Sequence, residues 1–277
     1  MNKSIVFMIL SVLAFTTMNV IVKYLSDFGA NQLVFFRSIG TLCFTVPLLL
    51  KTKVSFLGNH KKLLLLRGVV GLISLVCFFE SLKHLSIGTA VSIRYTSPIF
   101  AAILAFILLK EKVKIIQWFV FLFAFLGVLL VKGFSLEISS LGLLLILISA
   151  FFQGFVFVII RKIGSKENPL VIVNYFMIIT FLYGAITSIS NWKNPTINQW
   201  ILLLSLGVFG YIGQVYMTKA FQNNETNFVA PLKYLEVIFT IIFGVLFFNE
   251  YYSLLNILGV FFIISGLMYN IYLKRKN

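Results

Sequence analysis

Charged residues are scarce in this chain, and acidic residues are the scarcest of them. Only 11% of the 277 residues are charged, 60% are hydrophobic, and the mean hydropathy is +1.02. Soluble globular domains carry about 25% charged residues, so this composition excludes a soluble domain. The connections between the apolar runs are also short, which leaves no room for a catalytic head or a nucleotide-binding module.

Residues that ligate metals or serve as nucleophiles are equally few. The chain has two cysteines, Cys43 and Cys77, and two histidines, His60 and His84. Neither pair has the spacing of a zinc site, and both cysteines fall inside apolar runs, where packing is their expected role. We also find no phosphate-binding glycine loop, serine elbow or pair of carboxylates at catalytic spacing. The sequence therefore predicts no enzyme activity, no metal and no cofactor.

Long apolar runs are abundant. About 20 apolar residues span the roughly 30 Å hydrocarbon core of a bilayer. Ten such runs are recognised, at Ser4–Tyr24, Asn31–Lys51, Lys62–Leu82, Gly88–Leu109, Lys114–Lys132, Ser139–Ile160, Pro169–Ile189, Asn198–Ala220, Thr226–Phe248 and Ser253–Leu273. The first lacks an A-x-A cleavage site and is longer than the apolar part of a signal peptide, so we expect it to be retained. The predicted fold class is an all-α polytopic membrane protein with ten transmembrane helices.

Basic residues are distributed unequally between the two sides of these spans. Fourteen Lys and Arg residues between the spans fall on the side of the termini, against four on the other side: Lys23, Lys83, Lys132 and Lys193. Such an excess is typical of the cytoplasmic side. The sequence predicts cytoplasmic termini in the bacterial inner membrane. The net charge of +15 then reflects topology and contact with anionic lipids, and we expect no nucleic-acid partner.

The second half of the chain repeats the first at a constant offset of 139 residues, without a gap between 94–127 and 233–266. Matching pairs include Arg94 and Lys233, Tyr95 and Tyr234, Glu111 and Glu250, and Gly127 and Gly266. With five spans in each copy, the second copy enters the bilayer from the opposite side. We predict two inverted five-helix repeats, residues 1–134 and 135–277, an arrangement on which many secondary transporters are built.

Several ionisable residues lie inside the predicted spans. They are Arg37, Arg67, Glu80, Arg94, Lys219, Lys233 and Glu236. A charge at the centre of a membrane helix costs roughly 2.5–3.5 kcal/mol on insertion scales, so such residues persist where they face protein or a water-filled cavity. So many charges would be a poor arrangement for an inert bundle.

Glu236 is the most informative of these residues. It lies near the middle of its span, and its repeat counterpart is Ser97, so the repeat does not require it. Lys233 precedes it by three residues, a spacing that allows the two side chains to pair on one helix face. Two readings stay open. The carboxylate either contacts a cationic group of a substrate or carries a coupling proton, or the pair only neutralises itself and fixes packing.

Other polar residues and prolines extend this candidate site. Pro98 and Pro231 each remove a backbone hydrogen bond inside a span, and interrupted helices at matching places in two halves point toward a binding site. Uncharged polar residues inside spans bond either to a substrate or to a neighbouring helix. The predicted substrate-binding residues are Asn19, Arg94, Tyr95, Pro98, Gln153, Gln214, Lys233, Tyr234 and Glu236. The predicted gate or coupling residues are Arg37, Glu80 and Lys219, for which anchoring at the membrane interface is the alternative.

Short motifs add to the length and the repeat. They are Asn19 with Lys23, Phe35–Arg37, Leu109–Lys112, Phe248–Glu250 and Gly266. Together they resemble the drug/metabolite transporter superfamily, specifically the EamA-type carriers with ten helices in two inverted repeats, over nearly the whole chain. The resemblance implies transport of a small metabolite through a central cavity. Leu66–Gly68, Val229–Pro231 and Lys233–Glu236 are also similar to a branch that includes S-adenosylmethionine carriers, which implies a zwitterionic or cationic ligand at Glu236.

We therefore predict a secondary transporter that moves a small polar or amphipathic metabolite by alternating access. An S-adenosylmethionine-like or amino-acid-like compound is a candidate substrate. The expected partners are this substrate and membrane lipids. One alternative is a channel-like or structural membrane protein. A membrane-embedded lipid-modifying enzyme is the other, and it would need acids or histidines clustered at one leaflet.

Overall fold

The computed structural model describes residues 3–85, 87–132, 139–249, 251 and 253–275, and within these ranges the regular structure is entirely helical. The elements are α1 (Lys3–Tyr24), α2 (Ala30–Lys51), α3 (Lys61–Ser81), α4 (Ile87–Arg94), α5 (Ser97–Leu109), α6 (Ile115–Lys132), α7 (Ser140–Ile163), η1 (Gly164–Lys166), α8 (Pro169–Ser188), η2 (Ile189–Asn191), α9 (Ile197–Asn223), α10 (Thr226–Val229), η3 (Ala230–Tyr234), α11 (Leu235–Phe248) and α12 (Leu254–Arg275). Nine apolar helical stretches of the described chain are long enough to cross a membrane, and α6 supplies a shorter tenth. The predicted all-α membrane fold is confirmed.

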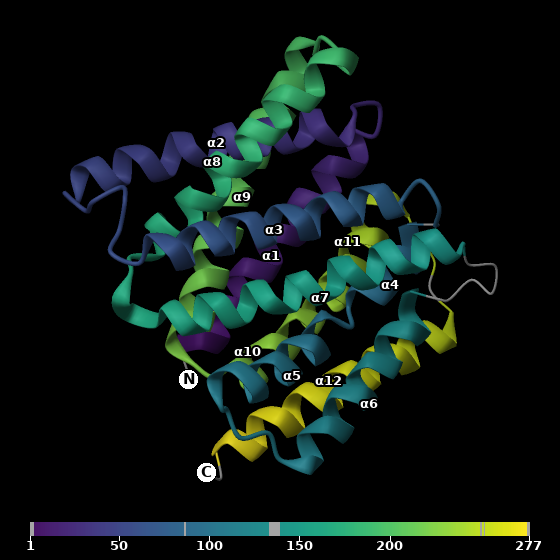
Figure 1. Ribbon diagram of the computed structural model, residues 1–277. Helices are drawn as coiled ribbons and strands as arrows, with labels where there is room; N and C mark the ends of the chain where they lie inside the picture. The colour runs from purple at the N-terminus through teal and green to yellow at the C-terminus, as the bar shows by residue number, and fades with distance from the viewer. Residues whose placement is uncertain (1–2, 86, 133–138, 250, 252, 276–277) are drawn as a thin grey trace.

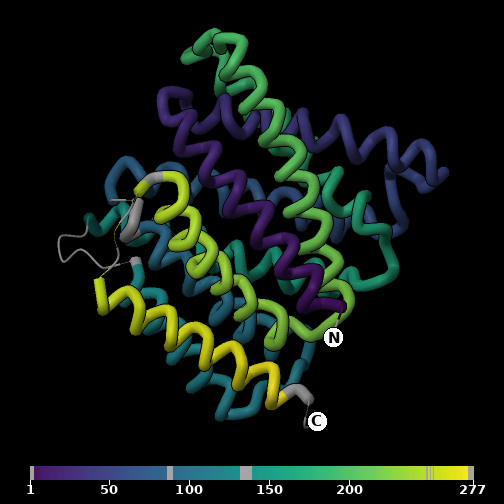
Figure 2. The backbone as a smooth tube through the Cα atoms, turned by 180° about the vertical axis from the view of Figure 1, so that it is seen from behind, coloured from purple at the N-terminus to yellow at the C-terminus, as the bar shows by residue number. Residues whose placement is uncertain are grey.

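Helices from the two halves of the chain pack against each other throughout the bundle (Figure 1). At one edge α2 packs on α8, and at the other edge α6 packs on α12, as Figure 2 shows from behind. Between these pairs, α1 packs on α9 and α3 packs on α7. Exchanging the two halves turns the contact of α1 with α9 into that of α7 with α3, so the packing itself has two-fold pseudosymmetry.

Two aromatic pairs mark the axis of this pseudosymmetry. The rings of Tyr95 and Tyr234 lie 6.2 Å apart, and the rings of Phe123 and Phe262 stack at 4.5 Å. The members of each pair are separated by the repeat offset of 139 residues. Equivalent residues can contact each other only beside the axis that relates them. The tyrosine pair therefore lies where the two halves meet.

The fourth and ninth spans are interrupted at equivalent places. The fourth divides into α4 and α5 at Tyr95, and the ninth contains the 3₁₀ helix η3, which ends at Tyr234. Pro98 stands in the first turn of α5, and because it has no N–H it cannot donate to the carbonyl of Arg94. Pro231 opens η3 in the same way. The prolines thus interrupt both helices next to the axis, as the sequence predicted.

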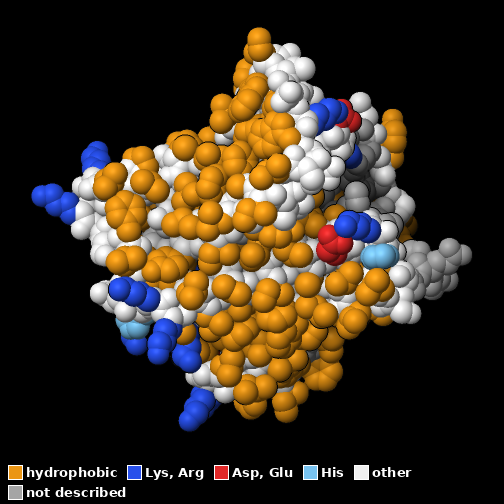
Figure 3. Space-filling model, turned by 45° about the horizontal axis from the view of Figure 1, so that its top comes forward, with side chains coloured by type: hydrophobic (Ala, Val, Ile, Leu, Met, Phe, Trp, Pro, Cys, Tyr) orange, Lys and Arg blue, Asp and Glu red, His pale blue; other side chains and the backbone are white. Residues whose placement is uncertain are grey.

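Both termini lie at one end of the bundle, which we call the terminal end (Figure 1). The connections α2–α3, α5–α6, α7–α8 and α9–α10 are at this end, because successive spans alternate in direction. Figure 3 shows apolar side chains over the middle of one face, with Lys and Arg gathered at its edge. An apolar belt bounded by basic residues is the surface expected of a protein that spans a bilayer.

Small residues allow the central helices to approach closely. A Cβ atom added to Gly207 of α9 would lie 2.4 Å from the Cα of Gly40 in α2. Gly68, the repeat counterpart of Gly207, faces Ile179, the counterpart of Gly40. Membrane helices associate through such close packing, because lipid offers no hydrophobic drive between them.

Replacing Gly207 by Ala is expected to lower the thermal stability of the protein in detergent. The added methyl group meets backbone atoms of α2, which cannot move aside as a flexible side chain can, and overpacking of this kind costs about 1–3 kcal/mol. Gly29→Ala is the matched control, because a Cβ there has nothing within 4 Å. Equal melting temperatures for the two variants would contradict the close α2–α9 contact.

Candidate functional site

Glu236 lies at the start of α11 and holds two donors from other parts of the bundle. Its Oε2 accepts a hydrogen bond from Lys233 Nζ at 2.6 Å, and its Oε1 accepts one from Asn19 Nδ2 of α1 at 3.1 Å. The side chains of Lys233 and Glu236 are 15% and 13% exposed. The pairing predicted from the three-residue spacing is present, and α1 adds a neutral donor that the spacing could not reveal.

Arg94, at the end of α4, contacts neutral groups. Its Nη2 donates to Gln153 Oε1 of α7 at 3.3 Å, and its guanidinium lies 4.2 Å from the centre of the Phe78 ring. It is also close enough to Glu236 for an electrostatic attraction. Among the described residues, no salt bridge joins Arg94 to Glu80. Glu80 pairs instead with Lys83 of its own helix turn.

Arg67 of α3 is a site residue that the predicted set omits. Its side chain is buried, with 1% exposure, and its Nη2 donates to Gln214 Oε1 of α9 at 3.0 Å. The guanidinium lies 4.1 Å from the centre of the Phe176 ring. Its Nε and Nη1 have no hydrogen-bond partner in the described part of the chain. An arginine inside a span, with no acid at helical spacing, was the signal that could have identified it.

Arg37 of α2 lies between the other two arginines. It is close enough to both Arg67 and Arg94 for their like charges to repel. Its guanidinium lies 5.9 Å from the ring of Phe15, and Lys233 Nζ lies 4.8 Å from the same ring. Arg37, predicted as a gate or coupling residue, thus lies close to the arginines of the candidate site.

We call Arg37, Arg67, Arg94, Lys233 and Glu236 the charged cluster. Tyr95 follows Arg94 directly and Tyr234 follows Lys233, so the tyrosine pair on the pseudo-two-fold axis adjoins the cluster. The hydroxyl of Tyr234 is buried and has no hydrogen-bond partner among the described residues. Every residue of the predicted substrate-binding set therefore lies in this cluster, contacts it or adjoins it.

Three of the five members of the charged cluster, Arg37, Arg67 and Glu236, do not follow the sequence repeat, and neither does Asn19. The repeat counterparts of Arg37, Arg67, Asn19 and Glu236 are Phe176, Leu206, Val158 and Ser97. The helix packing that the two repeats have in common therefore tolerates apolar or small residues at these positions. Charges that cost free energy in a bilayer and that the architecture does not need indicate a function.

Two predicted gate residues lie elsewhere. Glu80 and Lys83 are 44% and 67% exposed and form a surface ion pair. Lys219 Nζ lies 5.7 Å from the ring of Phe7 and 5.2 Å from that of Tyr216, near the terminal end of α9. Glu250, which completes one of the sequence motifs, lies outside the described residues.

Two other carboxylates join the halves at the terminal end. Glu111 accepts from the backbone N–H of Thr226 at 2.8 Å and from Arg161 Nε at 3.3 Å. Glu167 accepts from the backbone N–H of Asn59 at 2.6 Å. Both are 8% exposed or less. These contacts close the terminal end, and sequence reasoning missed them because each carboxylate is paired with groups from the other half.

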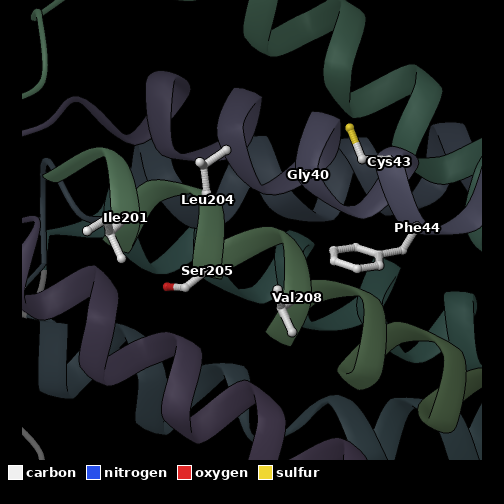
Figure 4. A pocket seen from close by; sticks show the side chains of 7 residues that line it. All are labelled: Gly40, Cys43, Phe44, Ile201, Leu204, Ser205 and Val208. Atoms are coloured by element: carbon white, nitrogen blue, oxygen red, sulfur yellow. The ribbon is translucent and has the colours of Figure 1, made fainter. Parts of the chain in front are cut away.

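A hollow of about 420 Å³ lies between α2 and α9, and unlike the charged cluster it has a mostly apolar lining. Its lining is Gly40, Cys43, Phe44, Ile201, Leu204, Ser205 and Val208 (Figure 4). It has no ionisable group other than the Cys43 thiol, so a polar solute would gain little there. The charged cluster is the better candidate site.

The arrangement has counterparts in known proteins. A family model described as "EamA-like transporter family" matches the chain twice, at residues 2–133 and 140–272. The chain belongs to this family. The resemblance seen in the sequence is thereby confirmed, and EamA membership points to a transporter rather than an enzyme.

Named relatives of this EamA protein are transporters. The pseudopaline exporter CntI of Pseudomonas aeruginosa is 30% identical over 94% of this chain and 92% of its own length. Human solute carrier family 35 member G1 is 28% identical, covering 87% of this chain and 71% of its own. The S-adenosylmethionine uptake transporter of Rickettsia bellii is 24% identical, covering 97% of this chain and 93% of its own length. This EamA chain is accordingly an integral membrane transporter for a small molecule.

A crystal structure shows the same fold. It superposes with a TM-score of 0.88 over 99% of this chain and 98% of its own, at 15% sequence identity. At that identity the likeness extends to the fold alone.

Proposed function

We propose that this chain is a secondary transporter that moves a small, ionised, amino-acid-like metabolite across the bacterial inner membrane by alternating access. The observation that carries the proposal is the charged cluster, which stands beside the pseudo-two-fold axis and in which Arg37, Arg67 and Glu236 have no charged counterpart in the repeat. In carriers built from inverted repeats, substrate sites lie at the repeat interface near the midplane, next to interrupted helices. The chain has both features at Tyr95 and Tyr234.

Alternating access requires two halves that rock against each other around a fixed site. We propose residues 1–134 and 135–277 as these halves, and the two family matches support that division. In the described structure Glu111 and Glu167 hold the halves together at the terminal end. Transport would then require these hydrogen bonds to break when the site opens to that end.

The substrate named for one relative, S-adenosylmethionine, and that named for another, pseudopaline, guide the chemistry of the proposal. Arg94 and Glu236 are close enough to attract each other. An amino-acid-like solute would place its carboxylate at Arg94 and its ammonium group at Glu236. A channel-like or structural role would leave unexplained why these costly charges stand beside the axis.

Proteoliposomes that contain the purified protein provide the test. They are incubated with a pool of cellular metabolites, and the accumulated solutes are identified by mass spectrometry. We expect at least one small ionised metabolite to accumulate above the level in protein-free liposomes. Accumulation of all small solutes alike would indicate a channel, and accumulation of none would contradict transport.

The terminal end is expected to face the cytoplasm. With Cys43 and Cys77 replaced, a cysteine introduced at Asn59, which lies in the α2–α3 connection, should be protected from an impermeant thiol reagent in intact cells. A cysteine at Asn191, after α8 at the opposite end, should react under the same conditions. The reverse labelling pattern would invert the topology.

A further inference from the structure

Two arginines of the charged cluster are oriented by a neutral amide and not by a carboxylate. Arg67 donates to the amide oxygen of Gln214 and Arg94 to that of Gln153, at 3.0 and 3.3 Å. Among the described residues, none of Arg37, Arg67 and Arg94 has a carboxylate oxygen within 4.0 Å. An amide fixes the direction of a guanidinium but leaves its positive charge uncompensated.

The cluster consequently has an excess of positive charge. The cluster contains four cations, the three arginines and Lys233, and the single carboxylate of Glu236, which already accepts a hydrogen bond from Lys233 at 2.6 Å. The guanidinium group of Arg37 is close enough to those of Arg67 and Arg94 to be repelled by both. Like charges held together in a low-dielectric region destabilise the protein, so a bound anion would offset a cost that the contacts within the fold leave uncompensated.

Free N–H groups remain for such an anion. Arg67 is 1% exposed, yet its Nε and Nη1 have no partner in the described chain, and the buried Nε of Arg37 is likewise unpaired there. Buried polar groups are nearly always hydrogen-bonded in native proteins, so unpaired ones call for an explanation. The guanidinium fork matches the oxygen pairs of carboxylate and phosphate groups, which fit these donors.

The arginines reach the cluster from both ends of the bundle. Arg67 is the seventh residue of α3, which starts at the terminal end, while Arg37 and Arg94 are the eighth residues of α2 and α4, which start at the opposite end. At 1.5 Å per residue these positions lie about 9–11 Å along each helix. The cations therefore surround the middle of the bilayer instead of forming a ring at one mouth.

We infer that the transported solute is a small organic anion with at least two negatively charged groups, held between Arg67, Arg37 and Arg94. This inference rests on the proposed transport function and narrows it. A further amino group on the solute would meet Glu236. A net cation such as S-adenosylmethionine would bind poorly, because it would add a positive charge to the excess already present.

A charge series tests the inference on the full-length protein in lipid nanodiscs. Thermal unfolding is measured with acetate, succinate, citrate and inorganic phosphate, and with spermidine and S-adenosylmethionine, all at constant ionic strength. Ligands that bind only the native state raise the unfolding temperature. We expect the concentration needed for a half-maximal rise to fall from acetate to succinate to citrate. The measurement with inorganic phosphate shows whether the site recognises phosphate groups as well as carboxylates.

Arg67→Gln is expected to weaken the effect of the best anion at least ten-fold. Lys61→Gln is the matched control, since it removes an exposed cation from the first turn of the same helix. If Arg67→Gln does not fold, Arg67→Lys supplies the test, because it keeps the charge but loses the fork and should give a smaller weakening. Stabilisation by the cations and not by the anions overturns the inference, as does an Arg67 variant that matches Lys61→Gln.

Solute uptake by proteoliposomes separates the two proposals. Accumulation of a neutral or cationic metabolite, without any multiply charged anion, overturns the anion inference and leaves the transport function standing. Anions that stabilise the protein through Arg67 while no solute is transported overturn the transport function and leave the anion site standing. Uptake of a multiply charged anion that Arg67→Gln diminishes supports both.

Discussion

Replacing Glu236 by Gln is expected to abolish or strongly weaken transport while membrane expression stays close to that of the parent protein. Glutamine keeps the shape and an acceptor for Asn19, but it removes the only carboxylate of the charged cluster. Lys233, now bonded to Glu236 at 2.6 Å, would become a further unpaired cation. The rate of uptake into proteoliposomes, normalised to the amount of folded protein, measures the effect.

Asp27→Asn is the control for the Glu236 variant. It makes the same chemical change at an exposed carboxylate, which lies 3.7 Å from Lys193 at the opposite end of the bundle. Exposed ion pairs of this kind contribute about 0–1 kcal/mol, so stability and transport should be retained. Transport by Glu236→Gln at the rate of the parent protein would instead make the Lys233–Glu236 pair a packing feature and remove Glu236 from the site.

Arg94→Gln and Lys233→Gln are expected to differ, although the two residues are repeat counterparts. Arg94 has a neutral hydrogen-bond partner, so its loss should weaken substrate binding and leave stability unchanged or slightly higher. A hydrogen bond to a charged group contributes about 1.5–3 kcal/mol, which corresponds to roughly a 10- to 150-fold loss of affinity. Lys233→Gln also deprives Glu236 of its partner and should lower both affinity and stability.

The concentration dependence of uptake and the unfolding temperature distinguish these outcomes. Lys162→Gln serves as a control for affinity, because it removes an exposed cation from the last turn of α7, outside the charged cluster. Parental affinity in both cluster variants, accompanied only by lower stability, would show that Arg94 and Lys233 never contact the substrate.

Much of the fold could be predicted from the sequence because the bilayer restricts what a chain can form. An apolar run of about 20 residues has to be helical in lipid, since only a helix satisfies its own backbone groups. The offset of 139 residues carries the start of α4 to that of α10 and Lys110 to Asn249, which share a left-handed backbone with φ of 55° and 50°. The sequence repeat is thus matched by a structural repeat that extends to the backbone conformation of single residues.

The membership of the site was harder to predict, because it depends on contacts between helices distant in the chain. The Lys233–Glu236 pair follows from a spacing of three residues, and the sequence identified it. The bonds of Arg67 to Gln214 and of Arg94 to Gln153 join residues 147 and 59 positions apart, which no local pattern specifies. In the sequence Arg67 therefore appeared as one of seven charges inside spans and as part of the Leu66–Gly68 motif, without an indication of its partners.

The sequence by itself determined that this is a helical membrane protein with two related halves, because hydropathy and repetition are properties of the chain. Only the tertiary structure decided which charges meet, and therefore the sign of the site. Sequence similarity favoured a zwitterionic or cationic ligand at Glu236. Three-dimensional packing places Lys233 on that carboxylate and Arg94 near it, and it brings Arg37 close to Arg67 and Arg94. Helix packing, and not order along the chain, sets the distance between these charges.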